Sequence, residues 1–390
     1  MNKNDLICEN NFLFDTAANS IVAYVGMDSD LIIPETIGGR EVKKLGEELF
    51  KNHEGLKRVT IPNGVTEIEP CTFSFCAGLK NITFPESVTD IQEHAFFCCE
   101  SLKSIALPSG MTHIAEYMFN VCESLESVDV TNTVKEIGTG AFSKCKRLAS
   151  ITLPRGLTKI SSFAFNECES LKSVDIPEGV TEIGAFAFSN CKSLTSVVIP
   201  SGVTQIESSA FYCCEGLTSV VVPDGVAEIE DSAFSWCEKL TRINIPNGVT
   251  RIGSSAFCGC SELSEIKIPY GVIGIWYSAF EECSSIKSVE IPGSVKHIGD
   301  KAFCGCKSLE SVNIPDGVEE IEEYTFCGCS SLTSIVIPDS VTVLRKGAFS
   351  GCANLTEIIY KGKKYGRNDM IELYKDIDRD EWFSNIIDKA

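Results

Sequence analysis

The strongest constraint on the fold of this chain is a repeat of 23 residues that runs through most of its length. Twelve of the fourteen prolines mark the repeat, and Thr131 stands where one more proline is due. The prolines of the series are Pro62, Pro85, Pro108, Pro154, Pro177, Pro200, Pro223, Pro246, Pro269, Pro292, Pro315 and Pro338. Such a constant step is typical of a solenoid, because each coil must stack on the previous coil at the same height.

Several apolar positions recur in every coil. Counted from the proline, position 11 is always phenylalanine, position 14 is always cysteine, and position 17 is leucine except for Ile286. Apolar residues also recur at positions 3, 6, 20 and 22, and position 10 is usually alanine. We expect these side chains to point inward, so that identical residues of successive coils lie over one another in continuous files, about 4.8 Å apart.

The spacing within one coil predicts its local structure. The alternating run at positions 17–22 indicates a short strand, which the next proline ends because proline lacks an amide donor. A glycine often follows and suits a bend, and positions 3–6 indicate a second short strand. The segment with the pattern A-F-x-x-C is interpreted as one or two helical turns. The expected fold class is therefore α/β: a curved parallel sheet, with second short strands and short helices on the other side.

The two ends of the chain do not fit the repeat. Residues 1–32 contain two β-rich runs, Phe12–Phe14 and Ile21–Val25, and are interpreted as a hairpin that caps the first coil. Residues 33–360 form the solenoid, with one 28-residue unit and then about thirteen 23-residue units. Residues 361–390 are interpreted as a helical cap, because an uncapped end would expose apolar edges. One predicted helical face holds Met370, Ile371, Tyr374 and Ile377, and a second holds Trp382, Phe383, Ile386 and Ile387.

The stretch "LTSVVIPSGVTQIESSAFYCCEGLTSVVVPDGVAEIEDSAF" resembles the BspA-like leucine-rich repeats, also called the Treponema-type or 23-residue class. The resemblance covers roughly residues 33–360, and the longer first unit also resembles the opening unit of such proteins. It implies a leucine-rich repeat solenoid in a bacterial or protist protein, often located at the cell surface and used for adhesion and protein binding. The family motif is structural and supplies no functional residues.

The net charge of −20 limits the kinds of partner. A strongly negative surface repels phosphate backbones and anionic lipids, so we expect neither nucleic-acid binding nor membrane insertion. The start of the chain has no secretory signal peptide pattern, and no anchoring segment is evident at the other end. The indications for the location therefore conflict. The resemblance to the family favours the cell surface, whereas the missing signal and the many thiols favour the cytoplasm.

Thirteen of the twenty cysteines occupy position 14, where we interpret them as small buried apolar residues. A linear row of cysteines does not converge on one point, so no metal site and no cofactor is predicted. Cys304 and Cys327 occupy the same position in adjacent coils and could form a redox pair. The four histidines are scattered, and no catalytic motif is present, so we predict that the protein is not an enzyme.

In leucine-rich solenoids the outward strand residues, here positions 19 and 21, form the usual binding face. Most of them are polar, but Val198 and Val221 are not. After Pro269, aromatic or apolar residues stand at positions that are mostly polar in other coils: Tyr270, Ile273, Trp276 and Tyr277. The leading hypothesis is a binding or adhesion module for a protein or glycan partner, with weak self-association as an open possibility. The alternative hypothesis is an intracellular thiol-responsive scaffold.

Overall fold

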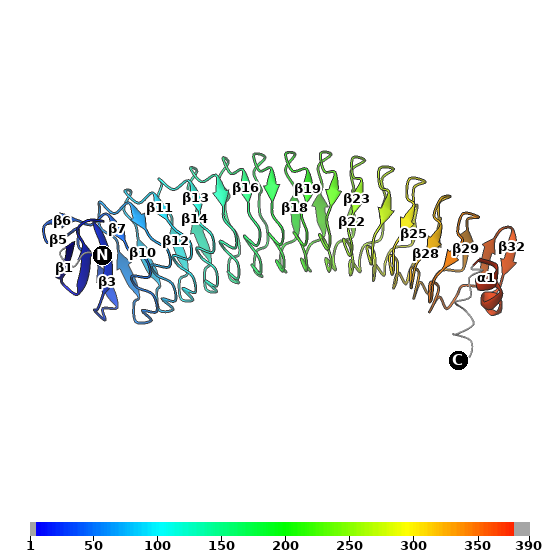
Figure 1. The fold of residues 1–390 in the computed structure, drawn as a ribbon, viewed down its shortest axis with the longest axis horizontal. Helices are drawn as coiled ribbons and strands as arrows, with labels where there is room; N and C mark the ends of the chain where they lie inside the picture. Colours follow the sequence, from blue (N-terminus) through cyan, green and yellow to red (C-terminus); the bar gives the residue numbers. More distant parts are fainter. Residues whose placement is uncertain (1–4, 378–390) are drawn as a thin grey trace. The chain divides into compact units, whose positions relative to one another are not determined.

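The computed structural model describes residues 5–377, except for the side chains of residues 367, 374 and 375. The chain divides into two compact units, Met1–Leu217 (unit 1) and Thr218–Ala390 (unit 2). Each unit is a β-solenoid in which short parallel strands of successive coils stack on one another, as Figure 1 shows. None of the helices in the described part has the length and apolar character to cross a bilayer.

The first strand of each coil lies just before the proline, and its outward residues at positions 19 and 21 form what we call the strand face. In unit 1 these strands are β4 (Asp30–Ile32), β8 (Arg58–Thr60), β10 (Asn81–Thr83), β12 (Ser104–Ala106), β14 (Ser127–Asp129) and β18 (Ser196–Val198). In unit 2 they are β20 (Ser219–Val221), β22 (Arg242–Ile243), β25 (Ser288–Val289), β27 (Ser311–Val312), β29 (Ser334–Ile337) and β31 (Glu357–Tyr360).

The second strand of each coil follows the bend and pairs in parallel at the same 23-residue step. In unit 1 these strands are β7 (Lys44–Leu45), β9 (Glu67–Ile68), β11 (Asp90–Ile91), β13 (His113–Ile114), β15 (Glu136–Ile137), β16 (Lys159–Ile160), β17 (Glu182–Ile183) and β19 (Gln205–Ile206). In unit 2 they are β21 (Glu228–Ile229), β23 (Arg251–Ile252), β24 (Gly274–Ile275), β26 (His297–Ile298), β28 (Glu320–Ile321) and β30 (Val343–Leu344). Their registers place the isoleucine of one coil beside that of the next, as in Ile137 beside Ile160.

The predicted files of identical side chains are confirmed within each unit. The phenylalanine file, which is the row of position-11 rings, begins at Phe50 in unit 1 and at Phe234 in unit 2. Neighbouring ring centroids lie 5.1 Å apart for Phe50 and Phe73 and 5.8 Å apart for Phe326 and Phe349, with nearly parallel planes. The residues at positions 3, 6, 14 and 17 are buried in every coil. The core is therefore a set of stacked files rather than a globular cluster.

The predicted short helices are wrong. The A-F-x-x-C segments are turns, and in every coil from Pro62 onward the residues at positions 9 and 13 have positive φ, for example Cys71 at 56° and Phe75 at 60°. The physical reason is hydrogen bonding between coils. The amides of Cys71, Phe73 and Phe75 donate to carbonyls of the next coil at 3.1, 2.8 and 2.7 Å, whereas a helix would direct them along its own axis. The α/β expectation is thereby corrected to a β-solenoid.

Irregular elements flank the coils. At the start, β1 (Leu6–Glu9), β2 (Phe12–Asp15) and β3 (Ser20–Tyr24) are antiparallel neighbours, and β3 pairs in parallel with β7. A small hairpin, β5 (Thr36–Ile37) and β6 (Arg40–Glu41), follows in the longer first unit. At the other end, β32 (Lys363–Tyr365) pairs with β31 and leads into η2 (Arg367–Asp369) and α1 (Met370–Ile377).

The predicted face of the last helix needs a correction. Among the described side chains of α1, the predicted Ile377 is buried and the predicted Met370 is half-buried. Leu373 is buried although it was not predicted, and Ile371 is 54% exposed although it was predicted to face inward. The second predicted face, with Trp382, Phe383, Ile386 and Ile387, lies outside the described residues.

Candidate functional site

The coil that follows Pro269 carries the most prominent group of exposed apolar side chains, which we call the aromatic patch: Tyr270, Ile273, Trp276 and Tyr277. Their exposed fractions are 76%, 63%, 39% and 48%. The two residues of β24 separate Ile273 from Trp276, so the members flank one short strand. The predicted exposure is therefore present, although no ring contact links Tyr270 with Trp276 among the described residues.

Trp276 is the best-supported member of the aromatic patch because its indole contacts both its own coil and the next coil. Its indole lies over Gly274, 3.6 Å from the position that a Cβ there would take, and its ring centroid is 5.2 Å from that of His297. Gly253 and Gly299 occupy the same position in the two adjacent coils. Packing on one side leaves the other side of the indole exposed, as is common for an interface anchor.

Tyr277 adds a polar neighbour to the aromatic patch. The Lys301 Nζ lies 5.8 Å from the centroid of the Tyr277 ring, within the range of a cation–π contact. The nearby tyrosine also raises the pKa of Lys301, with Glu281 as a second cause. The lysine therefore stays charged over the physiological range, and this part of unit 2 offers an aromatic surface beside a cation.

The two valines predicted on the strand face are both 56% exposed. Val198 belongs to unit 1, and Val221 belongs to unit 2. Within unit 2, Val336 and Ile359 are register partners of β29 and β31, and Val336 is 59% exposed. The strand face of unit 2 therefore carries an apolar pair made by adjacent coils.

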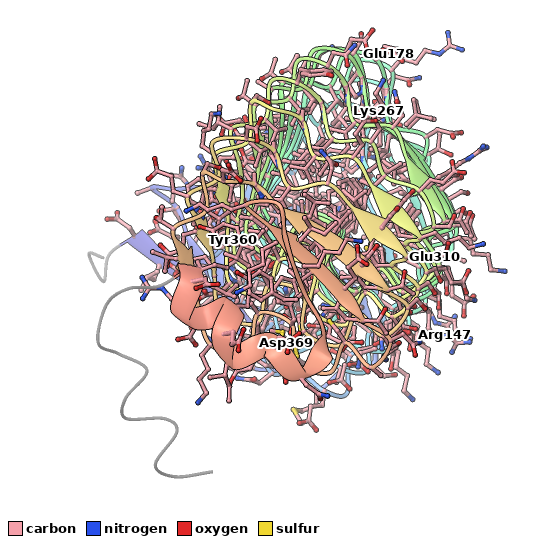
Figure 2. All side chains as sticks on the ribbon, turned by 90° about the vertical axis from the view of Figure 1, so that its right-hand side faces the viewer. Arg147, Glu178, Lys267, Glu310, Tyr360 and Asp369 are labelled. Carbon is pink, nitrogen blue, oxygen red and sulfur yellow. The ribbon has the colours of Figure 1, made fainter. Side chains whose placement is uncertain are left out.

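A shallow hollow of about 710 Å³ lies on the strand face of unit 2. Its charged residues are Arg242, Glu265 and Lys267, and Val221 lies at its margin. Arg242 and Lys267 are the two basic residues among positions 19 and 21 of unit 2. Figure 2 shows Lys267 at the outside of the coils. The hollow therefore combines cationic, anionic and apolar groups, which suits a mixed partner surface more than a small substrate.

Cys304 and Cys327 are brought together as predicted. Cys327 is close enough to influence the pKa of the Cys304 thiol, and the two residues are not joined by a disulfide. Burial, followed by the neighbouring Cys327 and the Glu281 carboxylate, raises the pKa of Cys304 to about 12. A thiol with so high a pKa is a poor nucleophile at neutral pH, because the thiolate is the reactive form.

The cysteines at position 14 also form hydrogen bonds between coils. Each of twelve such thiols donates to the carbonyl of the phenylalanine one coil earlier, at 3.1–3.3 Å, as Cys99 does to Phe73. No disulfide joins the cysteines of residues 5–377. Within residues 5–377 no three potential metal-binding side chains lie close enough together to hold an ion.

The sequence reasoning missed a second set of aromatic residues, on the turns of unit 1. His94 and Tyr117 stack at 5.1 Å, and Phe163 and Phe186 stack at 4.8 Å, all at position 9. Gly140, at position 9 of the coil between Tyr117 and Phe163, leaves room for the Tyr117 ring, which a side chain there would meet. Aromatic residues at one position of consecutive coils were the available signal, but the helical interpretation of this segment concealed it.

Comparison with known proteins agrees with this architecture. The family described as "BspA type Leucine rich repeat region (6 copies)" matches residues 43–171, 112–240, 158–286 and 227–356. A leucine-rich repeat protein from Bacteroides ovatus is 25% identical, with a TM-score of 0.58, over 89% of this chain and 100% of that chain. The pneumococcal vaccine antigen PcpA is 18% identical, with a TM-score of 0.57, over 96% of each chain. No curated protein matches the chain.

A further similar structure is a leucine-rich cell surface protein from Faecalibacterium prausnitzii, 27% identical over 96% of this chain and 98% of that chain, with a TM-score of 0.49. Coils with an inward leucine and two stacked parallel ladders define a leucine-rich repeat protein. The family matches extend over most of the chain, and the chain belongs to the BspA-type leucine-rich repeat family. Repeat proteins of this kind are generally protein-binding and typically non-enzymatic. The comparisons give no support to the thiol-responsive alternative.

Proposed function

We propose that the protein is a non-enzymatic adhesion module that binds a protein or glycan partner through unit 2, with the aromatic patch as the energetic centre of the contact. The observation that carries the proposal is the exposure of Tyr270, Trp276 and Tyr277 at positions that are mostly polar in other coils. Partly exposed aromatic side chains bury large areas at little entropic cost when a partner covers them.

Basic side chains in unit 2 support this proposal. Lys301 adds a cation beside Tyr277, and the hollow with Arg242 and Lys267 lies on the strand face of the same unit. The chain as a whole is strongly acidic, with a net charge of −20. Local cations on an acidic protein favour a defined partner over nonspecific attraction, because only the correct orientation brings opposite charges together.

The test is a binding panel with matched tryptophan variants. The full chain is applied to immobilised extracellular-matrix proteins and to a glycan array, and each ligand that binds is measured again with Trp276→Ala and with Trp236→Ala. Trp236 is 43% exposed and serves as the control, since it lies on the turn side of its coil. We expect Trp276→Ala to weaken binding about 30-fold, as a hot-spot truncation of about 2 kcal/mol does.

Two results would contradict the proposal. Equal losses with Trp236→Ala and Trp276→Ala would indicate general hydrophobic adhesion, and unchanged binding by Trp276→Ala would place the contact elsewhere. Binding to the immobilised proteins indicates a protein partner, and binding to the glycan array indicates a glycan partner.

A further inference from the structure

Four aromatic side chains on the turns of unit 1 form one connected group, which we call the ring cluster: Phe75, His94, Phe97 and Tyr117. They come from three consecutive coils. The rings of Phe75 and Phe97 meet edge to face with their centroids 5.1 Å apart, and Phe97 meets His94 at 5.6 Å. His94 stacks on Tyr117 at 5.1 Å. The turns of these coils therefore carry a continuous aromatic surface rather than separate rings.

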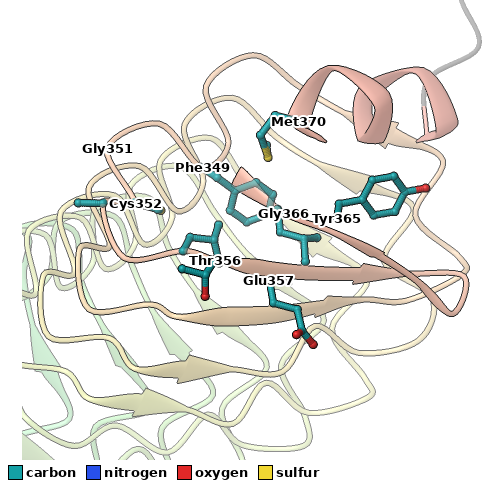
Figure 3. Close-up of a pocket in the computed structure, with 11 residues that line it drawn as sticks. Phe349, Gly351, Cys352, Thr356, Glu357, Tyr365, Gly366 and Met370 are labelled. Carbon is teal, nitrogen blue, oxygen red and sulfur yellow. The ribbon is translucent and has the colours of Figure 1, made fainter. Parts of the chain in front are cut away.

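The ring cluster is accessible to a partner. Phe75 is 41% exposed, and the other three rings are half-buried. The last ring of the phenylalanine file in unit 2 is a contrast, because Phe349 is only 7% exposed. Tyr365 of β32 and Met370 of α1 border the hollow beside it, as Figure 3 shows. Elements of the same chain shelter that ring, whereas the ring cluster keeps accessible aromatic surface.

Three carboxylates accompany the ring cluster: Glu93, Glu100 and Glu116. Two of them directly precede the stacked histidine and tyrosine in the chain, and all three are exposed. None of the three forms an ion pair within residues 5–377. Burial raises the pKa of Cys98, which follows Phe97, and the Glu100 carboxylate raises it further. The negative field of the carboxylates therefore reaches the residue beside the rings.

The second stacked pair on the turns of unit 1, Phe163 and Phe186, has a different setting. The residues that precede these two rings are Ser162 and Ala185 rather than glutamates. This pair therefore offers aromatic surface without a carboxylate directly before each ring, and it provides a comparison for the ring cluster.

We propose that the ring cluster binds an arginine-rich segment of a partner protein, with a guanidinium group over the rings of Phe75 and Phe97. The N–H groups of the guanidinium then donate to the carboxylates that accompany the rings. This inference goes beyond the proposed binding through unit 2 and does not depend on it. A guanidinium is planar and permanently charged, so it stacks on a ring and forms charge-assisted hydrogen bonds at the same time.

Charge complementarity favours this occupant over others. The net charge of −20 attracts a basic segment, and three carboxylates without ion pairs lie on the same turns as the rings. A lysine brings the same charge but lacks a planar group that stacks and donates together. A neutral glycan gains nothing from the charge of the carboxylates, and an acidic partner is repelled.

The test measures the binding of a fluorescently labelled arginine-rich peptide to the full chain by anisotropy at pH 7.5. A lysine-rich peptide and a neutral peptide of the same length are the comparison probes. We expect the arginine-rich peptide to bind most tightly and the neutral peptide least tightly, with weaker binding at about 200 mM than at about 50 mM salt. Equal binding of the arginine-rich peptide and either comparison peptide would overturn the proposal.

Aromatic variants show whether the rings take part. Phe75→Ala and Phe97→Ala should each weaken binding of the arginine-rich peptide about fivefold, as the loss of a cation–π contact does. Phe163→Ala removes an exposed ring from the comparison pair and should leave binding unchanged. An equal loss with Phe163→Ala would show general attraction to aromatic surface and would contradict the assignment to the ring cluster.

Charge variants decide the question even if an alanine variant fails to fold, because glutamine keeps the shape of glutamate. Glu93→Gln combined with Glu116→Gln should weaken binding about tenfold and reduce its dependence on salt. Asp129→Asn combined with Asp175→Asn changes the net charge equally, on exposed residues of the strand face of unit 1, and should have little effect. Equal losses in the two double variants would mean that the overall charge alone attracts the peptide, and the proposal would then be wrong.

Discussion

The buried cysteine file predicts an unusual sensitivity to alkaline pH. Burial raises the pKa of the position-14 thiols of unit 1, to about 12 for Cys76 and well above the usual value for Cys99 and Cys145. In the unfolded chain a cysteine titrates near 8.5. Above that pH the unfolded state loses protons that the folded state keeps. The stabilisation is therefore complete below about pH 8.5 and is lost as the pH rises towards the folded value.

The magnitude follows from the number of thiols. At about pH 9.5 one such thiol destabilises the folded state by roughly 1.4 kcal/mol. Unit 1 contains seven: Cys76, Cys99, Cys122, Cys145, Cys168, Cys191 and Cys214. The effect on unit 1 is then on the order of 10 kcal/mol, which equals the entire stability of many domains.

The assay is urea unfolding of the reduced protein between pH 7.5 and 10, for the wild type and for a variant with Cys122→Ala, Cys145→Ala and Cys168→Ala. The difference between the two isolates the thiols, because lysines and tyrosines titrate in both proteins. We expect the variant to be less stable at pH 7.5 but to lose about 4 kcal/mol less by pH 9.5. Cys8→Ala, which removes an exposed cysteine outside the file, is the control for the loss of a thiol as such. Parallel pH profiles for wild type and triple variant would refute the reasoning.

Three other outcomes are expected. Phe188→Ala, in the middle of the phenylalanine file of unit 1, should cost about 3–5 kcal/mol, and a melting temperature within error of the wild type would contradict the stacked file. Trp276→Ala should leave the melting temperature unchanged. If the protein self-associates through the aromatic patch, this variant should also show weaker self-association in light scattering. Cys304 should be alkylated slowly at pH 8, because with a pKa of about 12 only about one thiol in ten thousand is ionised. Cys327→Ala should accelerate that alkylation, as mass spectrometry of the labelled peptide can show, since Cys327 contributes to the raised pKa.

The stacking of Phe73 on Phe96 and of Ile137 on Ile160 could be predicted from the sequence. Because the 23-residue step is uninterrupted, residues at the same position of successive coils must lie over one another. The contact between Cys304 and Cys327 follows from the same rule. The left-handed backbone at Cys71, Phe75 and Tyr117 could not be predicted, because these residue types do not favour positive φ. Hydrogen bonds to the next coil impose that conformation, and they exist only after the coils have stacked.

One part of the candidate site could be predicted from the sequence, and another part could not. Exposure of Tyr270 and Trp276 could be predicted from their positions, whereas the contact of Trp276 with His297 joins different positions of two coils and needs the folded structure. By itself, the sequence determined the coil length, the inward residues and the family, since these depend on periodicity. Only the tertiary structure decided that the A-F-x-x-C segments are turns and that the cysteine thiols donate to carbonyls. Each of these depends on what the neighbouring coil supplies.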